Sequence, residues 1–401
     1  SIENALANSD LQCGRYEEAA QRFRHTLALE DSLPPEDRKF TNNGLGLALV
    51  LKGEAAEALN FYDERTRRYF ARLKPEDEIA LLNAKAYVNL QAGRYEDAIS
   101  TLKRAMALAE QTGAMHALTS IMGNLITALL KESRYAESLP LLQKILAFQR
   151  RMGSARDVAY SLVRQGSIYL TLGMGESARN CFDSGRQFLA QTQDPVLAVW
   201  YSLMDGYWEK EHGDPVKAAE LFRETEDEAK RIGSSEIVSW AEYAQADLAY
   251  DRMDFGACQR LLDELRPPGQ DKEFAARLHL LQAKLAATKG AAEGESLFAG
   301  VESECRDGHF REILCELYHN WALARRERQG PEAALPLLRQ GVQIVEAIVG
   351  SLPEEYRRRY LNQWRRKKLY EDLQALQSAP KGFGSKLRNF LQQTRQRLAR
   401  H

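Results

Sequence analysis

Gly93-Arg-Tyr-Glu-Asp-Ala98 is one copy of a short pattern that returns along most of the chain. A turn residue, usually glycine, opens each copy, acidic residues follow, and most copies end in a small residue. The copies begin at Gly14, Gly53, Gly93, Ser133, Gly173, Gly213, Met253, Gly290 and Gly330. Successive copies are 37 to 40 residues apart, and nine copies at nearly equal spacing indicate a tandem repeat.

The residue types within the repeat predict a helix, a tight turn and a second helix. Glycine at the turn accepts the left-handed backbone that ends the first helix. An acidic residue at the start of the second helix complements its dipole. A small residue five positions after the turn, such as Ala98, and another seven before it, such as Ala86, would let the two helices approach closely. Leucine or an aromatic nine positions after the turn, such as Leu102, would fill the space between neighbouring repeats.

The composition agrees with a wholly helical protein. Apolar residues make up 44% of the 401 residues, and only 12 prolines interrupt a chain rich in strong helix formers. One pair of helices cannot bury its apolar face alone, so neighbouring pairs must stack. The sequence therefore predicts an all-α fold, a right-handed α-solenoid of about nine helix-turn-helix repeats over residues 1–350.

The small–turn–small arrangement of Gly166, Gly173 and Ala178 resembles the tetratricopeptide repeat (TPR) family. The common unit of that family has about 34 residues, whereas this one has about 40. The resemblance covers residues 1–350. It implies a superhelix whose first helices line a concave groove that binds a protein or peptide.

A second and shorter resemblance follows the ninth repeat. Residues 352–361 read Leu-Pro-Glu-Glu-Tyr-Arg-Arg-Arg-Tyr-Leu, and residues 369–373 read Leu-Tyr-Glu-Asp-Leu. These look like the segment that closes the repeat array in large bacterial signalling proteins. Such proteins join the array to a Ser/Thr kinase or a signal-transducing ATPase, sometimes with a transcription-activation domain. The resemblance implies a cytoplasmic regulatory domain of a bacterial signal-transduction protein, of which this chain is a piece.

Catalytic and metal-binding signals are absent from the sequence. The chain has no P-loop, no HExxH and no GxSxG motif, so we expect neither an enzyme nor a bound cofactor. The five cysteines form no CxxC pair, which fits a reducing compartment. The sequence contains no run of 18 apolar residues, so we expect no membrane span. One His/Cys cluster is interpreted as buried thiols and surface imidazoles rather than a metal site; it contains Cys305, His309, Cys315 and His319.

Asparagines recur about ten residues before the turn in several first helices. Where these helices face the groove, the amides form a ladder that could hold the backbone of an extended peptide, because each amide both donates and accepts. The alternative is that the amides bond to one another within the array. The candidate residues are Asn43, Asn83, Asn124 and Asn320, with Asn4 in the first repeat.

Aromatic residues recur thirteen positions before the turn in the middle repeats, where Tyr160, Trp200 and Trp240 are 40 residues apart. Together with nearby polar residues they could line an amphipathic ligand pocket, because aromatics supply large contact area at binding sites. The alternative is that they pack between adjacent first helices. The remaining candidates for this pocket are Arg164, Tyr207, Tyr243 and Asp247.

The C-terminal part of the chain is strongly basic. Residues 356–401 carry 13 lysines and arginines against two acids, although the whole chain has a net charge of −1. We expect residues 351–378 to form a capping helix over the last apolar face, and residues 379–401 to form a basic amphipathic tail or linker. Nucleic acid is not an expected partner, because no recognition motif accompanies the charge.

Two functions are consistent with these observations. The first is a non-catalytic regulatory module that binds a protein, a peptide or a small effector in its groove and sits beside a kinase, ATPase or transcription-activation domain. The second is a passive scaffold or a homo-oligomerisation module, for example a homodimer.

Overall fold

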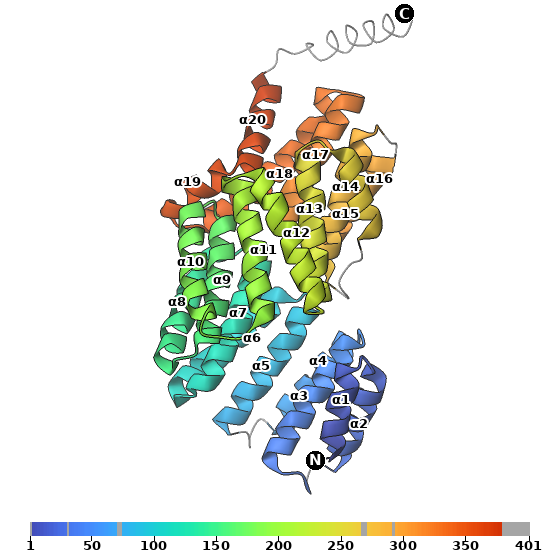
Figure 1. Cartoon of the computed structure of the whole chain (residues 1–401). Coiled ribbons are helices and arrows are strands. Elements are labelled where there is room, and N and C mark those ends of the chain that lie inside the picture. The colour runs from blue at the N-terminus through green and yellow to red at the C-terminus, as the bar shows by residue number, and fades with distance from the viewer. Residues whose placement is uncertain (1, 30–31, 70–73, 266–270, 291–292, 379–401) are drawn as a thin grey trace, which may run out of the picture. The chain divides into compact units, whose positions relative to one another are not determined.

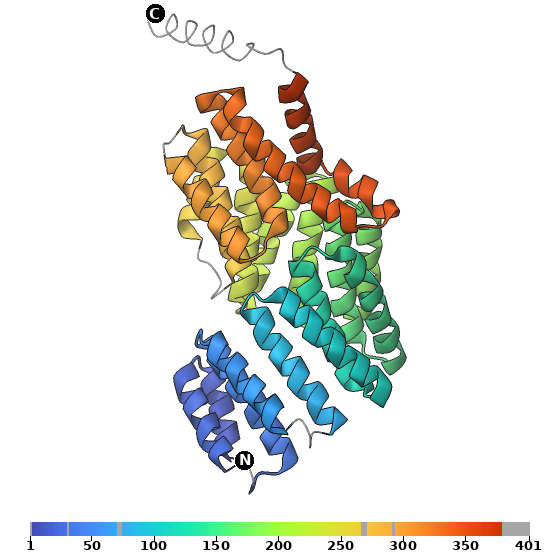
Figure 2. The same cartoon turned by 180° about the vertical axis from the view of Figure 1, so that it is seen from behind.

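The computed structural model describes residues 2–29, 32–69, 74–265, 271–290 and 293–378. These residues form twenty helices and no strand (Figures 1 and 2). The helices are α1 (Ile2–Gln12), α2 (Tyr16–Ala28), α3 (Pro35–Leu51), α4 (Ala55–Tyr69), α5 (Pro75–Gln91), α6 (Tyr95–Thr112), α7 (Met115–Lys131), α8 (Tyr135–Met152), α9 (Ala155–Thr171), α10 (Gly175–Leu189), α11 (Pro195–His212), α12 (Pro215–Arg231), α13 (Ser235–Asp251), α14 (Phe255–Glu264), α15 (Lys272–Thr288), α16 (Glu293–Asp307), α17 (Arg311–Gln329), α18 (Pro331–Ser351), α19 (Glu354–Asn362) and α20 (Trp364–Ser378).

The helices follow the repeat. Odd-numbered helices from α1 to α17 are the first helices of the pairs, and even-numbered helices from α2 to α18 are the second helices. Most consecutive helices pack on each other, and first helices also pack on the next first helix, as α3 does on α5 and α15 on α17. The predicted all-α repeat fold is confirmed.

The chain divides into two compact units. The first unit contains residues 1–132 and 137–145, and the second contains residues 133–136 and 146–401. The division falls inside the predicted range 1–350 and passes through α8, which contributes residues to both units. No helix in the described ranges is long and apolar enough to cross a membrane.

The turn residues have positive φ at eight of the nine copies of the pattern. At the third copy, Arg94 N–H donates to the Asn89 carbonyl over 2.8 Å, which closes the end of α5 with a Schellman-type bond. Glycine is not essential at the turn position of the repeat, because Ser133 and Met253 open two other copies and also have positive φ, at 54° and 61°. Most of these positions are glycine because it adopts this conformation without steric cost.

The copy at Gly213 departs from the prediction, because its φ is −123° and therefore not left-handed. Here Pro215 opens α12, and the Asp214 carboxylate accepts from the Val216 N–H over 2.8 Å. An aspartate cap and a proline at the first helical position start the second helix directly. The left-handed glycine expected at this turn was therefore wrong.

The small residue before each turn faces the large residue after it, within one repeat. A Cβ added at Gly166 would lie 2.2 Å from a ring carbon of Phe182, and one at Gly206 would lie 2.4 Å from Phe222. Each ring, rather than the small residue of the second helix as predicted, occupies the space that the glycine leaves. The rings also reach the next repeat, as predicted from the sequence: the ring centroids of Phe182 and Tyr201 are 6.4 Å apart.

The predicted capping segment forms two helices, α19 and α20, with a change of direction at Gln363. It is anchored by the fully buried Leu352, Tyr360 and Leu369. Figure 2 shows both helices continuing from the end of α18, and the Arg359 carbonyl of α19 lies close to Gly173 in the turn between α9 and α10, within the second unit. The predicted tail over residues 379–401 lies outside the described residues.

Candidate functional site

The first unit carries an open groove on the face formed by its first helices. A pocket of about 720 Å³ is lined by α3, α5 and α7, with Tyr62 of α4 and the turn at Gly113 completing it. Its floor is apolar and includes the buried side chains of Ile79, Val88 and Ile121. The groove therefore combines an apolar floor with polar residues at its rim, which is the usual composition of a ligand site.

Three of the predicted asparagines line this groove: Asn43 on α3, Asn83 on α5 and Asn124 on α7. The Asn124 amide donates to Oδ1 of Asn83 over 3.0 Å, and the Asn83 amide donates to Oγ of Ser120 over 3.4 Å. The side chain of Asn43 is exposed and forms no hydrogen bond with any described residue. The amides thus bond partly to each other and partly face open space, and each retains donor or acceptor capacity.

Charged and polar side chains border the same groove. Lys39 on α3 and Glu76 in the first turn of α5 are both exposed, and so is His116 in the first turn of α7. Tyr87 contributes a half-exposed ring from the centre of α5, and its burial raises the pKa of its hydroxyl. These groups could bind a ligand that carries both charge and apolar side chains.

The other predicted asparagines lie elsewhere. Asn320 on α17 donates to the Glu316 carbonyl within its own helix, over 2.8 Å. The buried Asn4 donates to both the carbonyl and the carboxylate of Asp37 over 3.4 Å and accepts from Thr41 over 2.9 Å. Both amides therefore bond within the helix array, and the ladder in the first unit consists of Asn43, Asn83 and Asn124.

The aromatic candidates lie in the second unit, where most of them pack on one another. The Trp240 ring packs edge to face on two other rings. Its centroid lies 4.9 Å from that of Phe274 and 6.0 Å from that of Tyr243. The ring centroids of Tyr207 and Phe222 are 5.3 Å apart. Trp200 is partly buried and packs against the apolar core that contains Phe222. These rings therefore pack against one another and against neighbouring helices of the second unit.

Tyr160 and Arg164 are a more open pair on α9. Tyr160 is 51% exposed, and the Arg164 guanidinium lies 5.8 Å from its ring centroid. Burial lowers the pKa of Arg164, although the nearby Tyr160 opposes this effect. The structure thus separates this pair from the packed rings of α11 and α13.

Asp247, the last candidate, belongs to a buried cluster of charged groups. The carboxylate cluster consists of Asp247 and Asp251 on α13 and Glu316 on α17. Lys210 is paired with Asp247 and lies 2.9 Å from Asp251. Lys284 lies 2.7 Å from Glu316 and 3.5 Å from Asp247. Two lysines from α11 and α15 therefore neutralise two of three carboxylates.

The third positive charge comes from the C-terminal segment. Arg365, in the first turn of α20, lies 2.9 Å from Glu316 and 3.2 Å from both Asp247 and Asp251. Its guanidinium fork thus contacts all three members of the carboxylate cluster. These carboxylates and lysines come from α11, α13, α15 and α17, so the face formed by the first helices of the second unit is occupied at this point by the chain itself. We call this face the concave face, because first helices line the inner side of such arrays.

The electrostatics of this cluster favour the charged forms of Asp247, Glu316 and Lys284. Burial acts to raise the pKa of Asp247, but Lys210, Arg365 and Lys284 outweigh it and hold that pKa well below its usual range. Burial likewise opposes the charge of Glu316, whereas Arg365 and Lys284 lower its pKa to about 2. Glu316 and Asp247 in turn raise the pKa of Lys284 against its burial. The arrangement is stable only while opposite charges are balanced.

Five members of this cluster were not among the candidates predicted from the sequence: Lys210, Asp251, Lys284, Glu316 and Arg365. One signal for them is present in the repeat: Asp247 and Lys284 both lie six residues before their turn, in consecutive repeats. Opposite charges at one position of adjacent first helices predict an ion pair on the groove side. The involvement of Arg365 has no such signal, because it comes from outside the repeat.

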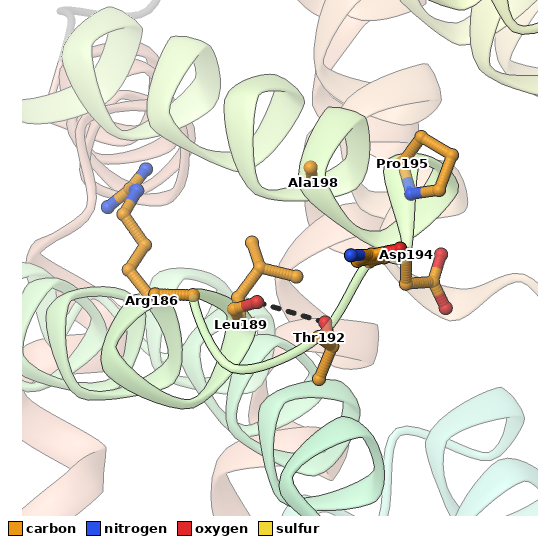
Figure 3. Close-up of a pocket in the computed structure, with 8 residues that line it drawn as sticks. Arg186, Leu189, Thr192, Asp194, Pro195 and Ala198 are labelled. Atoms are coloured by element: carbon orange, nitrogen blue, oxygen red, sulfur yellow. Dashed lines mark hydrogen bonds between the residues drawn. The ribbon is translucent and has the colours of Figure 1, made fainter.

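A second hollow lies at the turn between α10 and α11 and has a volume of about 590 Å³ (Figure 3). Its polar groups are used by the turn itself. The Thr192 hydroxyl donates to the Leu189 carbonyl over 2.9 Å, and the Asp194 carboxylate caps α11 by accepting from Leu197 N–H. Arg186, at its edge, pairs with Asp205. This hollow offers little to a ligand.

The cysteines and histidines of the predicted His/Cys cluster are dispersed. Cys305 and Cys315 are buried, and burial raises the pKa of the Cys305 thiol to about 12. His309 occupies a turn with φ of 57°, and His319 lies 2.8 Å from Asp372. Within the described ranges, no three His, Cys, Asp or Glu residues are arranged to hold a metal ion.

No family model and no curated protein matches the sequence. Solved structures do match the fold. A Rap protein complexed with Competence and Sporulation Factor has a TM-score of 0.62 at 11% identity, over 88% of this chain and 99% of that chain. The NprR protein in complex with its cognate peptide NprX has a TM-score of 0.59 at 13% identity, over 86% and 97%.

A signal-transduction ATPase with a tetratricopeptide repeat sensor, from Pyrococcus horikoshii, matches 75% of this chain and 46% of its own, with a TM-score of 0.51 at 15% identity. The fold is a tetratricopeptide-type repeat array. The TPR array described here thus has the helix-pair architecture of these proteins, with a repeat of about 40 residues instead of the common 34.

Proposed function

We propose that this TPR array is a non-catalytic regulatory module that binds a peptide or a small effector in the groove of its first unit. The observation that carries the proposal is the open groove of about 720 Å³, in which Asn43, Asn83 and Asn124 border an apolar floor. Amides can pair with the N–H and C=O groups of an extended backbone, and the floor can take apolar side chains.

The structural relatives support this choice. Two of them were solved with Competence and Sporulation Factor and with a cognate peptide, respectively, and a third carries its repeats as the sensor of an ATPase. The proposal places this array in the same class, as the sensing part of a bacterial cytoplasmic signalling protein that also contains a kinase, ATPase or transcription-activation domain. Occupancy of the groove would then bias the arrangement of helices that the neighbouring domain contacts.

The test begins with the purified chain and a library of random linear peptides, from which binders are selected and their affinities measured by calorimetry. The double variant Asn43→Ala/Asn124→Ala removes two amides of the ladder. Each lost hydrogen bond is worth about 1 kcal/mol, so affinity should fall roughly tenfold or more. Asn60→Ala is the matched control, since Asn60 is an exposed asparagine on α4 that does not line the groove.

Equal affinity of the double variant and the wild-type chain would show that the selected peptides bind elsewhere. Failure to select any peptide, together with a concentration-dependent mass in solution, would favour the scaffold or homodimer function instead. Either outcome would remove the groove of the first unit as a peptide-binding site.

A further inference from the structure

The C-terminal segment lies on the concave face of the second unit through two adjacent arginines. The strap is defined here as residues 353–378, which include α19 and α20. Arg365 enters the carboxylate cluster of Asp247, Asp251 and Glu316, as described above. Arg366 enters a second acidic site one helical turn away, where its guanidinium lies 2.7 Å from Glu312.

The two acidic sites are built side by side on α17. Glu312 and Glu316 are four residues apart and therefore lie on the same face of that helix. The hydroxyls of Tyr135 and Tyr360 both donate to Glu312 over 2.9 Å, which fixes the position of its carboxylate. Consecutive arginines can thus be bound by consecutive turns of one helix.

The strap also reaches the end of α9. Arg366 donates to the Thr171 carbonyl over 3.0 Å, and Gln363 donates to the Leu170 carbonyl over 2.5 Å. These carbonyls belong to the last turn of α9, where a positive charge is favoured by the helix dipole. The turn itself is in close contact with the strap, because a Cβ at Gly173 would lie 2.7 Å from the Arg359 carbonyl oxygen.

The contacts of the strap differ in kind on its two sides. Toward α17 and α18 they include apolar packing, such as Leu369 against Gly341. Toward α9 and α13 the strap forms ion pairs and hydrogen bonds through Gln363, Arg365 and Arg366. The strap is thus anchored at the end of the array by packing, whereas its hold on the concave face is polar.

Charge balance determines what can occupy this face. Without Arg365, two lysines would face three carboxylates, and one carboxylate of this largely desolvated cluster would remain without a cation. An uncompensated buried charge is strongly unfavourable, so the site requires a cation. Three carboxylates around one position match the planar fork of arginine better than the single ammonium of lysine.

We propose that the concave face of the second unit is a recognition site for an arginine pair, and that Arg365 and Arg366 of the strap occupy it in cis. The ligand class is a peptide that carries two adjacent arginines. Such a peptide, supplied by the strap of another copy of this chain, competes with the strap in cis for the same carboxylates. This proposal concerns the second unit and does not depend on the groove of the first.

The test uses the full chain with Arg365→Gln and Arg366→Gln, and a fluorescein-labelled peptide of residues 354–378. The labelled peptide should bind this variant at least tenfold more tightly than it binds the wild-type chain, whose own strap fills the site. A peptide with glutamine at positions 365 and 366 is the control for sequence-independent binding. Equal affinity of the two peptides for the variant, including no binding by either, would overturn the proposal.

A matched protein control is Lys367→Gln/Lys368→Gln. It removes the same charge from the same helix, but these lysines pair only with Glu371 and Asp372 of the strap in the described structure. Circular dichroism checks that each variant is folded. The lysine variant should bind the labelled peptide no better than the wild-type chain does, and tight binding by it would show that charge alone loosens the strap.

A second measurement needs no substitution in the protein. Hydrogen exchange is followed in the wild-type chain with an excess of the arginine peptide or of the glutamine peptide. Competition predicts faster exchange of the strap amides with the arginine peptide only. The same exchange with both peptides would overturn the proposal even where the arginine variant does not fold.

Discussion

Asn124 donates a 3.0 Å hydrogen bond to Asn83, which lies one repeat earlier on the neighbouring first helix. The bond joins two amides across adjacent first helices at the rim of the groove in the first unit. It shows how the ladder is built, because equivalent positions of successive repeats face the same side. Under the proposed function, the stability of the first unit and the binding of a ligand would depend on the same side chains.

This amide pair should show energetic coupling. Asn83→Ala and Asn124→Ala each remove the bond. The double variant should therefore lower the local opening free energy little more than either single variant does, with a coupling energy of about 0.5–1 kcal/mol. Native-state hydrogen exchange of α5 and α7 amides measures the local opening free energy of this region. Strictly additive costs would mean that the two amides do not interact in solution.

Gly166→Ala should destabilise the second unit. The new methyl group would lie 2.2 Å from the Phe182 ring, and both elements are held in a packed core, so we expect a loss of about 1–3 kcal/mol. The matched control is Gly300→Ala on α16, where no atom lies within 4 Å of the added carbon. That change should be neutral or stabilising by up to about 1 kcal/mol, because alanine favours helix.

Tryptophan fluorescence during urea unfolding measures these effects selectively. All five tryptophans lie in the second unit, at positions 200, 208, 240, 321 and 364. A fluorescence transition therefore reports that unit alone. Equal midpoints for the Gly166 and Gly300 variants would contradict the close packing of glycine and ring.

The repeat pattern predicts the helices and turns well because each depends on local chemistry. The spacing of about 40 residues locates the turns, and glycine at most of them marks the left-handed positions. Gly213 shows the limit of this reasoning, because Asp214 and Pro215 start the next helix by a different local signal. Asp214 followed by Pro215 is a helix-start signal in the sequence, but the glycine at the turn position predicted a left-handed turn instead.

The candidate sites were predicted less completely, for a physical reason. A repeat specifies which positions of successive first helices share a face, and Asn43, Asn83 and Asn124 all line the groove of the first unit. It does not specify what else enters the groove. Arg365 pairs with Asp247 across 118 residues, and such a contact depends on the path of the chain after the last repeat.

Trp240→Ala should lower the stability of the second unit by about 2–4 kcal/mol. The ring packs edge to face on Phe274 and Tyr243 between α13 and α15, so its removal leaves a cavity. Tyr160→Ala serves as the control, because that side chain is 51% exposed and should cost less than about 1 kcal/mol. The remaining four tryptophans report the unfolding transition. A small effect of Trp240→Ala would restore this ring as a candidate for ligand contact.

The second unit should lose stability as the pH falls from about 5 to 2. The folded structure lowers the pKa of Glu316 from 4.5 to about 2 and holds that of Asp247 below 3.8. Both carboxylates thus contribute stability that is complete above their unfolded pKa values and is lost as the pH falls toward their folded values. Urea unfolding at several pH values, followed by tryptophan fluorescence, measures this dependence.

Glu316→Gln separates this contribution from the general effect of acid. At pH 7 the variant leaves Lys284 and Arg365 short of one carboxylate, so we expect it to be less stable by about 3–5 kcal/mol. Its stability should then change less between pH 5 and 2, because the group with the lowered pKa is gone. Glu371→Gln, on the exposed side of α20, should keep the wild-type dependence. If Glu316→Gln had the same acid slope as the wild type, the charge cluster would not set the acid stability of this unit.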